Sequence, residues 1–426
     1  MNVKIEPESV QGTIDAIPSK SHLHRLLICA AIAKIPREIL VKNLEAEDIK
    51  ATMKCLQIIG ARFDQYDHSI RVRAITRTRK PSECVLPVGE SGSTLRFLLP
   101  VVAALGITAT FEMEGRLPER PLHPLDEQLT KHGITITRPT PTTLRTCGQL
   151  QAGDYVLPGN VSSQYISGLL MALPLLKQRS TLEITGNIES ESYIDLTLAA
   201  QQKFRMNHFY NQQKFTITET SRYGGTKALT VDGDWSNGAF WLVCGAMRGS
   251  SVTLNKISKK SLQGDRKITD ILLQLGATVR WRKNQVTVTG NRRQAVDIDA
   301  SGIPDLIPVL AAVLSVAEGT SRITNAGRLR MKESDRLATT AATLNTLGAK
   351  VTELEDGLII EGVPNLKGGT VDAHNDHRIA MCAAVAALAC TEPVIITGAE
   401  AVNKSYPQLW ADFAKLGGMI DVDMEK

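Results

Sequence analysis

The feature that most constrains the fold of this chain is an internal repeat of about 71 residues. Six nearly all-apolar segments begin on a small polar residue, a proline or an aspartate: Ser19, Ser91, Ser162, Ser236, Pro304 and Asp376. Their starts are 72, 71, 74, 68 and 72 residues apart. A helix that is apolar on every side is typical of a buried helix. Six copies of one α/β unit therefore account for the chain, because 426/6 is 71.

A second signature has the same period. Glycine closes an amphipathic helix at Gly60, Gly133, Gly276, Gly348 and Gly417. These glycines are 73, 143, 72 and 69 residues apart, and 143 is twice 71.5, so a degenerate copy is expected near residue 204. Glycine after a helix suits the left-handed conformation of a C-cap. Each unit is predicted to hold a buried helix, a strand, an exposed amphipathic helix and a strand pair.

Length and composition indicate more than one core. The chain has 426 residues, of which 43% are hydrophobic and 22% charged, as in ordinary globular proteins. We expect two domains of three units each. The segment 231–236 lies at the midpoint and is the preferred crossover, and 15–18 is a candidate second hinge strand. Two hinge strands would permit closure of a cleft.

Charge and cysteine usage exclude several functions. The net charge is +5, no Lys/Arg block stands out and only 4% of residues are aromatic, which favours small anionic ligands over a nucleic-acid surface. Seven cysteines without a C-x-x-C motif suggest neither a zinc site nor a disulfide framework. The start has no signal-peptide pattern, and the apolar runs 306–317 and 379–390 are too short to span a bilayer. We expect a cytoplasmic protein without nucleic-acid or membrane partners.

Polar residues gather where the buried helices begin. The first apolar helix opens on Lys20, Ser21, His22, His24 and Arg25, although a cap would need only Ser19. Buried cations are costly unless they are paired. Similar groups occur at 89–96, 162–164 and 376–378, and Arg116, Arg120 and Lys404 precede exposed helices. If these helix N-termini converge, they form an anion-binding site; the alternative is simple capping.

The stretch from Met331 to Arg336 is predicted to open an amphipathic helix. Lys332 and Arg336 are four residues apart and would share a face in its first turn, where an anion would be favoured. Glu333 beside them is a candidate acid or base. The alternative is a solvated face with surface ion pairs.

Nucleotide and metal motifs are absent from the sequence. It contains no G-x-x-x-x-G-K-[ST], no G-x-G-x-x-G after a strand and no H-E-x-x-H. His374 and His377 are three residues apart, but no further ligands accompany them. We expect proton transfer by carboxylates and lysines with no metal and no cofactor.

Ten short motifs occur in order along the repeat: 18–21 with Arg25, 92–93 with Arg96, 119–121, 162–164, 193–195, 263–265, 303–305, 332–336, 375–378 and 404–407. Together they resemble the enolpyruvyl transferases, and among them the EPSP synthase family. The resemblance implies an α/β fold of two domains, each of three repeated βαβαββ units with buried helices, and a ligand cleft between the domains. The first domain would span 19–232, mainly on the shikimate 3-phosphate side. The second would comprise 1–18 and 233–426, mainly on the phosphoenolpyruvate side.

The reaction implied by the resemblance is transfer of the enolpyruvyl group of phosphoenolpyruvate to the 5-hydroxyl of shikimate 3-phosphate, with release of phosphate from a tetrahedral adduct. No cofactor is implied, and a monomer acting on small molecules is expected. Asp305 is the candidate base on the hydroxyl, and Glu333 and Lys404 would handle the methylene proton. Lys20 completes the candidate catalytic set.

The resemblance also implies two sets of binding residues. Shikimate 3-phosphate would contact Lys20, Ser21, Arg25, Ser162, Ser163, Gln164, Ser190, Tyr193, Asp305 and Lys332. Phosphoenolpyruvate would contact Lys20, Gly92, Arg120, Gln164, Arg336, Arg378 and Lys404. Arginine forks suit carboxylate and phosphate oxygens.

Several positions depart from the family pattern. Glu90 stands where asparagine is common, Phe97 replaces a smaller residue, Arg328 occupies another asparagine position, and Glu191 and the stretch 235–237 also differ. In the family, glyphosate competes with phosphoenolpyruvate near the helix that carries Phe97, so the sequence leaves open whether this chain is sensitive to the inhibitor.

Particular residues distinguish this function from three others. A UDP-N-acetylglucosamine enolpyruvyl transferase would have Lys-Asn where this chain has Lys20-Ser21, and a cysteine within 112–123, where none occurs. A non-catalytic anion-binding scaffold would have lost Asp305, Glu333 and Lys404, which are present. A nucleic-acid ring built from repeats would need a basic stripe, which the scattered charges do not form.

Overall fold

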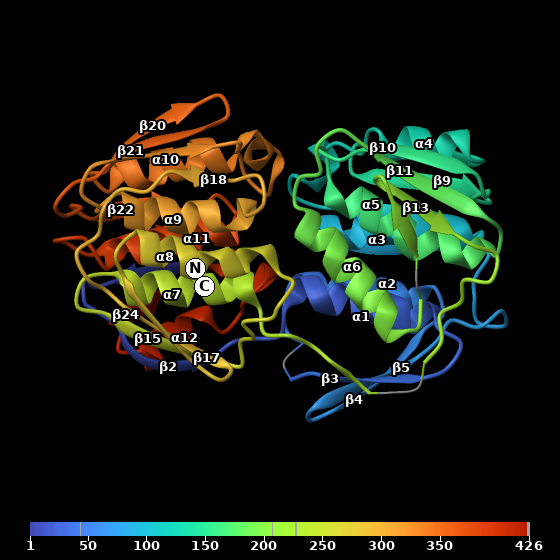
Figure 1. Ribbon diagram of the computed structural model, residues 1–426, viewed down its shortest axis with the longest axis horizontal. Coiled ribbons are helices and arrows are strands. Elements are labelled where there is room, and N and C mark those ends of the chain that lie inside the picture. The colour runs from blue at the N-terminus through green and yellow to red at the C-terminus, as the bar shows by residue number, and fades with distance from the viewer. Residues whose placement is uncertain (43, 207, 226–227, 424–426) are drawn as a thin grey trace. The chain divides into compact units, whose positions relative to one another are not determined.

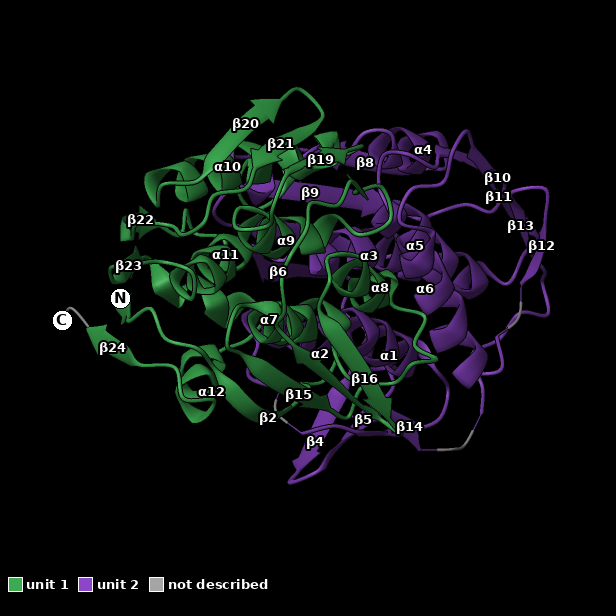
Figure 2. Ribbon diagram, turned by 60° about the vertical axis from the view of Figure 1, so that its left-hand side comes forward, with its two compact units in different colours: residues 1–19, 232–426 green, residues 20–231 purple. Residues whose placement is uncertain are grey.

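The computed structural model describes residues 1–42, 44–206, 208–225 and 228–423. These residues form two compact units, shown in different colours in Figure 2. Unit 1 comprises 1–19 and 232–426, and unit 2 comprises 20–231. Within the described residues, each unit contains three four-stranded sheets. No helix in the described ranges is long and apolar enough to cross a membrane.

One copy of the repeat shows how each sheet is built (Figure 1). β6 (Glu83–Gly89) runs parallel to β7 (Thr108–Met113), and the buried helix α3 (Gly92–Leu105) connects them. After α4 (Leu125–Lys131), the hairpin of β8 (Ile134–Thr137) and β9 (Thr143–Gly148) adds antiparallel to β7. This is the predicted βαβαββ order, and the predicted fold class is confirmed.

The other two copies in unit 2 follow the same plan. Their helices are α1 (Lys20–Ile32), α2 (Glu47–Ile58), α5 (Ser163–Ala172) and α6 (Glu191–Lys203), with η2 (Leu173–Leu176) as a 3₁₀ turn. The 3₁₀ turn η1 (Leu117–Glu119) belongs to the first copy, between β7 and α4. Their strands are β3 (Arg37–Leu40), β4 (Arg62–Tyr66), β5 (Ser69–Arg73), β10 (Asp154–Pro158), β11 (Ser180–Thr185), β12 (Phe209–Asn211), β13 (Lys214–Ile217) and β14 (Leu229–Thr230). The degenerate copy expected near residue 204 is α6 with the β12–β13 hairpin, and its helix ends at Phe204 without a glycine.

Unit 1 holds the remaining copies. Its helices are α7 (Trp235–Ala246), α8 (Ile268–Gln274), α9 (Ile307–Leu314), α10 (Arg336–Thr346), α11 (His377–Ala387) and α12 (Leu409–Lys415). Its 3₁₀ turns are η3 (Gly264–Lys267), η4 (Pro304–Leu306), η5 (Gly327–Met331) and η6 (Ala399–Lys404). Its strands are β1 (Asn2–Ile5), β2 (Gln11–Asp15), β15 (Ser251–Asn255), β16 (Thr278–Arg282), β17 (Gln285–Thr289), β18 (Ile298–Asp299), β19 (Thr320–Thr324), β20 (Lys350–Leu354), β21 (Gly357–Glu361), β22 (Gly369–Asp372), β23 (Val394–Thr397) and β24 (Ile420–Asp423).

The two chain crossings exchange strands. β2 precedes α1 in the sequence but pairs in parallel with β15 of unit 1. β14 precedes α7 but pairs in parallel with β3 of unit 2. The crossing segments themselves pair, since Pro18 bridges to Gly233 and Asp234 N–H donates to the Ile17 carbonyl over 2.8 Å. The two predicted hinge segments therefore lie side by side.

Close helix packing in unit 2 depends on a glycine. A Cβ at Gly168 of α5 would lie 2.4 Å from the Arg96 carbonyl oxygen of α3, closer than real contacts allow. Without a side chain at this position, the backbones of α3 and α5 approach closely. The polar residues at the start of α5 are thereby brought beside those of α3.

Candidate active site

The helix α10 begins at Arg336, five residues later than the prediction. Residues 327–331 form η5, and Lys332 and Glu333 lie in non-helical backbone before the cap residue. Asp335 caps the helix, because its carboxylate accepts from the N–H groups of Leu337 and Ala338 at 3.2 Å. The prediction that Lys332 and Arg336 share the first helical turn is therefore wrong. Because the Asp335 side chain takes the hydrogen bonds of a cap, the helix does not extend toward the N-terminus beyond this residue.

Arg336 binds three carboxylates at once. Its side chain is 2% exposed, and its guanidinium lies 2.8 Å from Asp305 Oδ1, 2.8 Å from Glu333 Oε2 and 2.8 Å from Asp376 Oδ2. Burial lowers the pKa of Arg336, but the charges of Asp376, Glu333 and Asp305 more than offset this effect and raise it. The alternative of a solvated face is wrong for this residue, because a charge-paired cluster surrounds it. The cluster holds two predicted catalytic carboxylates.

Asp305 lies in η4 and is held ionised. Burial alone would raise the pKa of its carboxyl, but Lys332, Arg336 and Arg378 together hold that pKa below its ordinary value. Lys332 Nζ lies 3.5 Å from Asp305 Oδ1, so Lys332 joins the cluster although it is outside the helix. A carboxylate with a low pKa is a proton acceptor whose strength depends on how firmly its cations are held.

The start of α11 supplies the third part of this cluster. Asp376 is fully buried and caps α11 by accepting from the Arg378 N–H at 2.9 Å. Arg378 is 3% exposed, and its Nη1 donates to the Ser236 carbonyl at 2.7 Å. Lys404, at the end of η6, donates from Nζ to the Asn375 carbonyl, one residue before Asp376. The predicted residues Asp305, Lys332, Glu333, Arg336, Arg378 and Lys404 are thus all in unit 1, around two helix starts.

The remaining predicted residues are in unit 2, where hydroxyl and amide groups accompany the cations. At the start of α1, Lys20 Nζ lies 2.6 Å from Asp48 Oδ2. Arg25 is 2% exposed, and its guanidinium donates to the Ser21 carbonyl and Thr197 hydroxyl at 2.7 Å and to the Tyr193 carbonyl at 2.9 Å. Burial lowers the pKa of Arg25 to about 10, so it stays charged at neutral pH. Arg25 therefore ties α1 to α6.

The starts of α3 and α5 are cross-linked by side chains. Arg96 Nη1 donates to the Gln164 amide oxygen at 2.8 Å, and the Gln164 amide nitrogen donates to the Ser93 hydroxyl at 3.0 Å. Ser162 caps α5 through the Gln164 N–H. A Cβ at Gly92 would lie 2.8 Å from Arg96 Nη1 and 2.9 Å from Arg120 Nη1, so a glycine leaves room for both guanidinium groups. The structure brings these groups together at two adjacent helix N-termini, where an anion would be favoured, and the anion-binding site itself stays a prediction.

Ser190 and Tyr193 lie at the start of α6. Ser190 is 5% exposed and adopts a left-handed conformation with φ of 54°. A serine held at positive φ is uncommon. Its position places it beside Tyr193, whose carbonyl is bound by Arg25. The structure therefore links this pair to the start of α1 through one guanidinium.

Sequence reasoning missed several residues of these clusters. Asp48, Asp265 and Asp376 each contribute a carboxylate, and only Asp376 and Asp265 fell within quoted motifs. A buried chain of hydroxyls also went unnoticed, in which Thr52 Oγ1 lies 2.7 Å from His24 Nδ1 and 2.6 Å from Thr94 Oγ1. Threonines on helices have no distinctive spacing, so no local signal marks them.

Three of the departures from the family pattern, Phe97, Glu90 and Arg328, have distinct surroundings. Phe97 is 1% exposed, and its ring centroid lies 4.9 Å from the Arg25 guanidinium carbon. Glu90 folds against Gly115, where a Cβ would lie 2.3 Å from Glu90 Oε2. Arg328 donates to the Ser301 carbonyl at 2.9 Å. Phe97 thus contacts Arg25, a predicted site residue, and also packs edge-on against His24, with ring centroids 6.4 Å apart.

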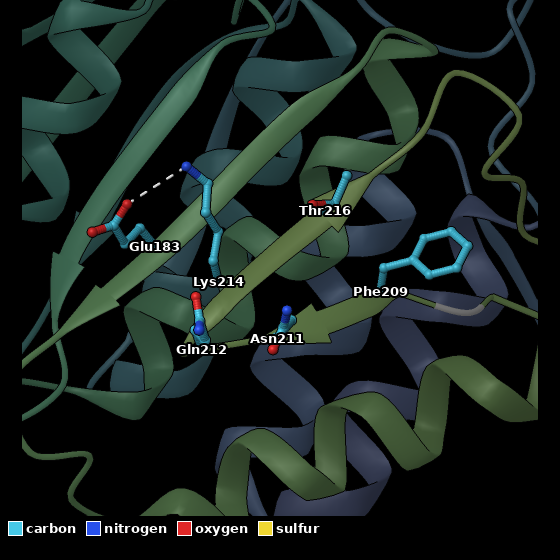
Figure 3. A pocket seen from close by; sticks show the side chains of 6 residues that line it. All are labelled: Glu183, Phe209, Asn211, Gln212, Lys214 and Thr216. Carbon is cyan, nitrogen blue, oxygen red and sulfur yellow. Dashed lines mark ion pairs between the residues drawn. The ribbon is translucent and has the colours of Figure 1, made fainter.

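Two surface pockets lie away from these clusters. The pocket in Figure 3 measures about 390 Å³ and is lined by side chains from β11, β12 and β13, among them Phe209, Lys214 and Glu183. A second, of about 720 Å³, lies where α7 and α9 end, and Arg248 and Arg293 line it. Cations at helix C-termini are favoured by the helix dipole. Neither pocket contains a predicted site residue. No group of three or more metal-ligating side chains occurs among the described residues.

Comparison with known proteins identifies the family. The family model of EPSP synthase (3-phosphoshikimate 1-carboxyvinyltransferase) matches residues 5–413. A protein named 3-phosphoshikimate 1-carboxyvinyltransferase from Clostridium kluyveri is 43% identical over 426 residues, covering 98% of this chain and 98% of the relative. One of the same name from Clostridium novyi is 40% identical over 435 residues, covering 99% and 98%.

Comparison with solved structures supports the same family. An EPSP synthase from Acinetobacter baumannii superposes with a TM-score of 0.82 at 25% identity, covering 99% of this chain and 100% of that one. The enolpyruvyl transferase NikO from Streptomyces tendae shares the fold, with a TM-score of 0.76 at 18% identity over 99% and 98% of the two chains. These findings support the main interpretation over the sister enzyme and the scaffold. Because the family model and the relatives span nearly the whole sequence, the chain belongs to the EPSP synthase family.

Proposed function

We propose that this chain transfers the enolpyruvyl group of phosphoenolpyruvate to the 5-hydroxyl of shikimate 3-phosphate and releases phosphate. The family match supports this reaction, and its partners are therefore small-molecule substrates. The observation that carries the proposal is the cluster in which Asp305 and Glu333 are held by Arg336. Two carboxylates close to cations are what an addition followed by an elimination requires.

The addition needs one base and one acid. The 5-hydroxyl oxygen attacks C2 of phosphoenolpyruvate and loses its proton, while the C3 methylene gains a proton and becomes a methyl group. Asp305 is the base for the hydroxyl, and Glu333 with Lys404 delivers the proton to C3. Elimination then returns a methyl proton to Glu333 and Lys404 as the C–O bond to phosphate breaks, and the departing phosphate takes up the proton that Asp305 had accepted. Atoms and charge balance, and no cofactor takes part.

Substrate anions would tune the base. Asp305 in the described structure lies close to Arg336 and Lys332, which hold its pKa low. A carboxylate or phosphate group that draws these cations toward itself weakens their hold on Asp305 and makes it a stronger base. Binding of the substrates would in this way prepare the proton transfer.

The second cluster suits the anionic groups of the substrates. In unit 2, the start of α5 offers Ser162, Ser163 and backbone N–H groups, an arrangement that favours a phosphate group. We infer that unit 2 (predicted as 19–232) mainly binds shikimate 3-phosphate and that unit 1 (predicted as 1–18 and 233–426) mainly binds phosphoenolpyruvate. Gly92, Arg120, Gln164 and Lys20 would add contacts to phosphoenolpyruvate from unit 2. The monomeric state and the cytoplasmic location stay predictions.

The decisive experiment measures phosphate release from phosphoenolpyruvate without added metal. We expect release that requires shikimate 3-phosphate and does not occur with UDP-N-acetylglucosamine. A Glu333→Gln variant, which keeps the shape of the side chain, is expected to lose about 10²- to 10⁴-fold in rate. A folded wild-type protein that releases no phosphate with either acceptor would contradict the proposal, and release only with the sugar nucleotide would assign the sister reaction.

A further inference from the structure

Asp265 is a buried carboxyl to which the proposed reaction gives no role. It lies in η3 of unit 1 and is 1% exposed. One carboxyl oxygen, Oδ2, accepts from the Ser236 hydroxyl, whereas Oδ1 has no hydrogen-bond partner among the described residues. Buried polar atoms without a partner are rare, and each one calls for an explanation. A carboxyl kept at this position is therefore expected to do more than fill space.

Ser236 connects Asp265 to Arg378. It is the second residue of α7, and its carbonyl oxygen accepts from Arg378 Nη1 at 2.7 Å. Arg378 is 3% exposed, and its Nε has no hydrogen-bond partner in the described structure. Ser236 is thus held at both ends, by Asp265 through its hydroxyl and by Arg378 through its carbonyl. The three side chains come from η3, α7 and α11, so the contact joins three separate elements.

The electrostatics of Asp265 suit an anchoring role. Burial, and then the charge of Asp305, raise the pKa of Asp265 to about 7, while the Ser236 hydroxyl and Arg378 act in the opposite direction. With a pKa of about 7, the carboxyl of Asp265 is only partly ionised at neutral pH, and in either state it accepts a hydrogen bond from a hydroxyl. A partly ionised carboxyl attracts the guanidinium of Arg378 less than a fully ionised one would, so it leaves that guanidinium more available to an incoming anion.

We propose that Asp265 is a positioning residue that, through Ser236, fixes the guanidinium of Arg378 in the orientation that binds phosphoenolpyruvate. The inference rests on the proposed function, which places Arg378 at that substrate. Asp265 itself touches no substrate. A simple structural role, in which Asp265 only ties η3 to α7, is the alternative.

The test is steady-state kinetics of four variants: Asp265→Ala, Asp265→Asn, Ser236→Ala and the double variant of the two alanine changes. We expect the alanine variants to raise KM for phosphoenolpyruvate about tenfold while KM for shikimate 3-phosphate changes less than about twofold. Asp265→Asn keeps an oxygen that accepts from the Ser236 hydroxyl, so we expect it to stay within about threefold of the wild type. The double variant is expected to raise KM for phosphoenolpyruvate no more than the more severely affected single variant does, because Asp265→Ala and Ser236→Ala break the same contact.

Three results would overturn the inference. They are an unchanged KM for phosphoenolpyruvate in active Ser236→Ala protein, equal rises in KM for both substrates, and additive losses in the double variant. If Asp265→Ala does not fold, Ser236→Ala and Asp265→Asn still decide the question. Wild-type protein assayed in parallel separates the two proposals, since its inactivity would refute the proposed function, whereas a normal wild type with insensitive variants refutes only the role of Asp265.

Discussion

Two arginines, one in each unit, are equally buried but differently paired. Arg336 in unit 1 and Arg25 in unit 2 are 1% and 2% exposed. Arg336 contacts three carboxylates, whereas the hydrogen bonds of Arg25 run to hydroxyl and carbonyl oxygens. The pKa of Arg336 is raised, and burial lowers that of Arg25 to about 10.

The different partners of Arg336 and Arg25 suit different chemical roles. A guanidinium among carboxylates neutralises them and sets their basicity, which suits proton transfer. A guanidinium that binds neutral oxygens leaves its positive charge uncompensated by these contacts, and such a charge favours anions nearby. This contrast agrees with the proposed function, in which Asp305 and Glu333 of unit 1 transfer protons and Arg25 of unit 2 is among the residues proposed to bind shikimate 3-phosphate.

The largest expected effect comes from removing each arginine in turn. Arg336→Met leaves Asp305, Glu333 and Asp376 without their shared cation, so we expect a loss of about 3–5 kcal/mol in the free energy of unfolding together with loss of activity. Arg25→Met leaves only neutral oxygens unpaired and should cost about 1–3 kcal/mol. Urea unfolding of both variants measures this difference.

The surface arginine Arg330 is the control for that comparison. It pairs with Asp335 and Glu353 but is 29% exposed, so Arg330→Met should cost no more than about 1 kcal/mol. An Arg25 variant as unstable as the Arg336 variant would show that the identity of the partners does not matter, and would break the comparison.

A second pair of variants separates chemistry from binding. Asp305→Asn in unit 1 removes the candidate base and should lower kcat by about 10²- to 10⁴-fold. Ser162→Ala in unit 2 removes the cap of α5 and a hydroxyl that is proposed to bind phosphate, so KM for shikimate 3-phosphate should rise about tenfold with a small change in kcat. Initial rates with each substrate varied in turn give both constants. The division between units would be refuted if Ser162→Ala lowered kcat as strongly as Asp305→Asn.

Two buried groups, Asp265 in unit 1 and His24 in unit 2, should make stability depend on pH with opposite signs. In unit 1, the folded pKa of Asp265 is about 7, above its ordinary value of 3.8, so the folded state keeps a proton that the unfolded chain releases. Its contribution to stability is therefore lost as pH rises from 3.8 through 7, by up to about 4 kcal/mol. In unit 2, burial lowers the pKa of His24 well below 6.5, so the contribution of His24 is present above pH 6.5 and is lost as pH falls.

Urea unfolding at pH 5 and pH 8 tests both signs. Asp265→Asn is expected to raise the free energy of unfolding at pH 8 and to change it much less at pH 5. His24→Gln should flatten the loss of stability on acidification. The first sign would be contradicted if the free energy of unfolding of Asp265→Asn, relative to that of the wild type, were lower at pH 8 than at pH 5.

The smallest expected effect is at Glu90, close to the cations of unit 2. Glu90→Asn removes one negative charge from the start of α3, so we expect KM for phosphoenolpyruvate to fall about two- to threefold at low salt and less at high salt. Inhibition by glyphosate should strengthen in parallel. KM for phosphoenolpyruvate is measured for the variant and the wild type at two ionic strengths. Equal values in both proteins would show that the charge of Glu90 does not act on bound phosphoenolpyruvate.

Much of the fold could be predicted because its signals are local. The apolar helices and the glycines after the exposed helices recur along the chain, and each follows from burial or a C-cap within a few residues. The start of α10 was misplaced because Asp335, a capping residue inside the stretch, interrupts a pattern that apolar spacing alone would extend. The exchange of β2 and β14 between units has no local signature, since each strand pairs with a segment far away in the sequence.

The sequence by itself determined the repeat, the α/β fold and the presence of cations, hydroxyls and carboxylates at the starts of buried helices. Only the tertiary structure decided which of these groups meet. Glu333 is three residues from Arg336, but Asp305 and Asp376 are 31 and 40 residues away, and Asp265 reaches Arg378 only through Ser236. Periodicity records which face a residue occupies on its own helix, whereas a charge cluster depends on how separate helices pack, which no short stretch of sequence encodes.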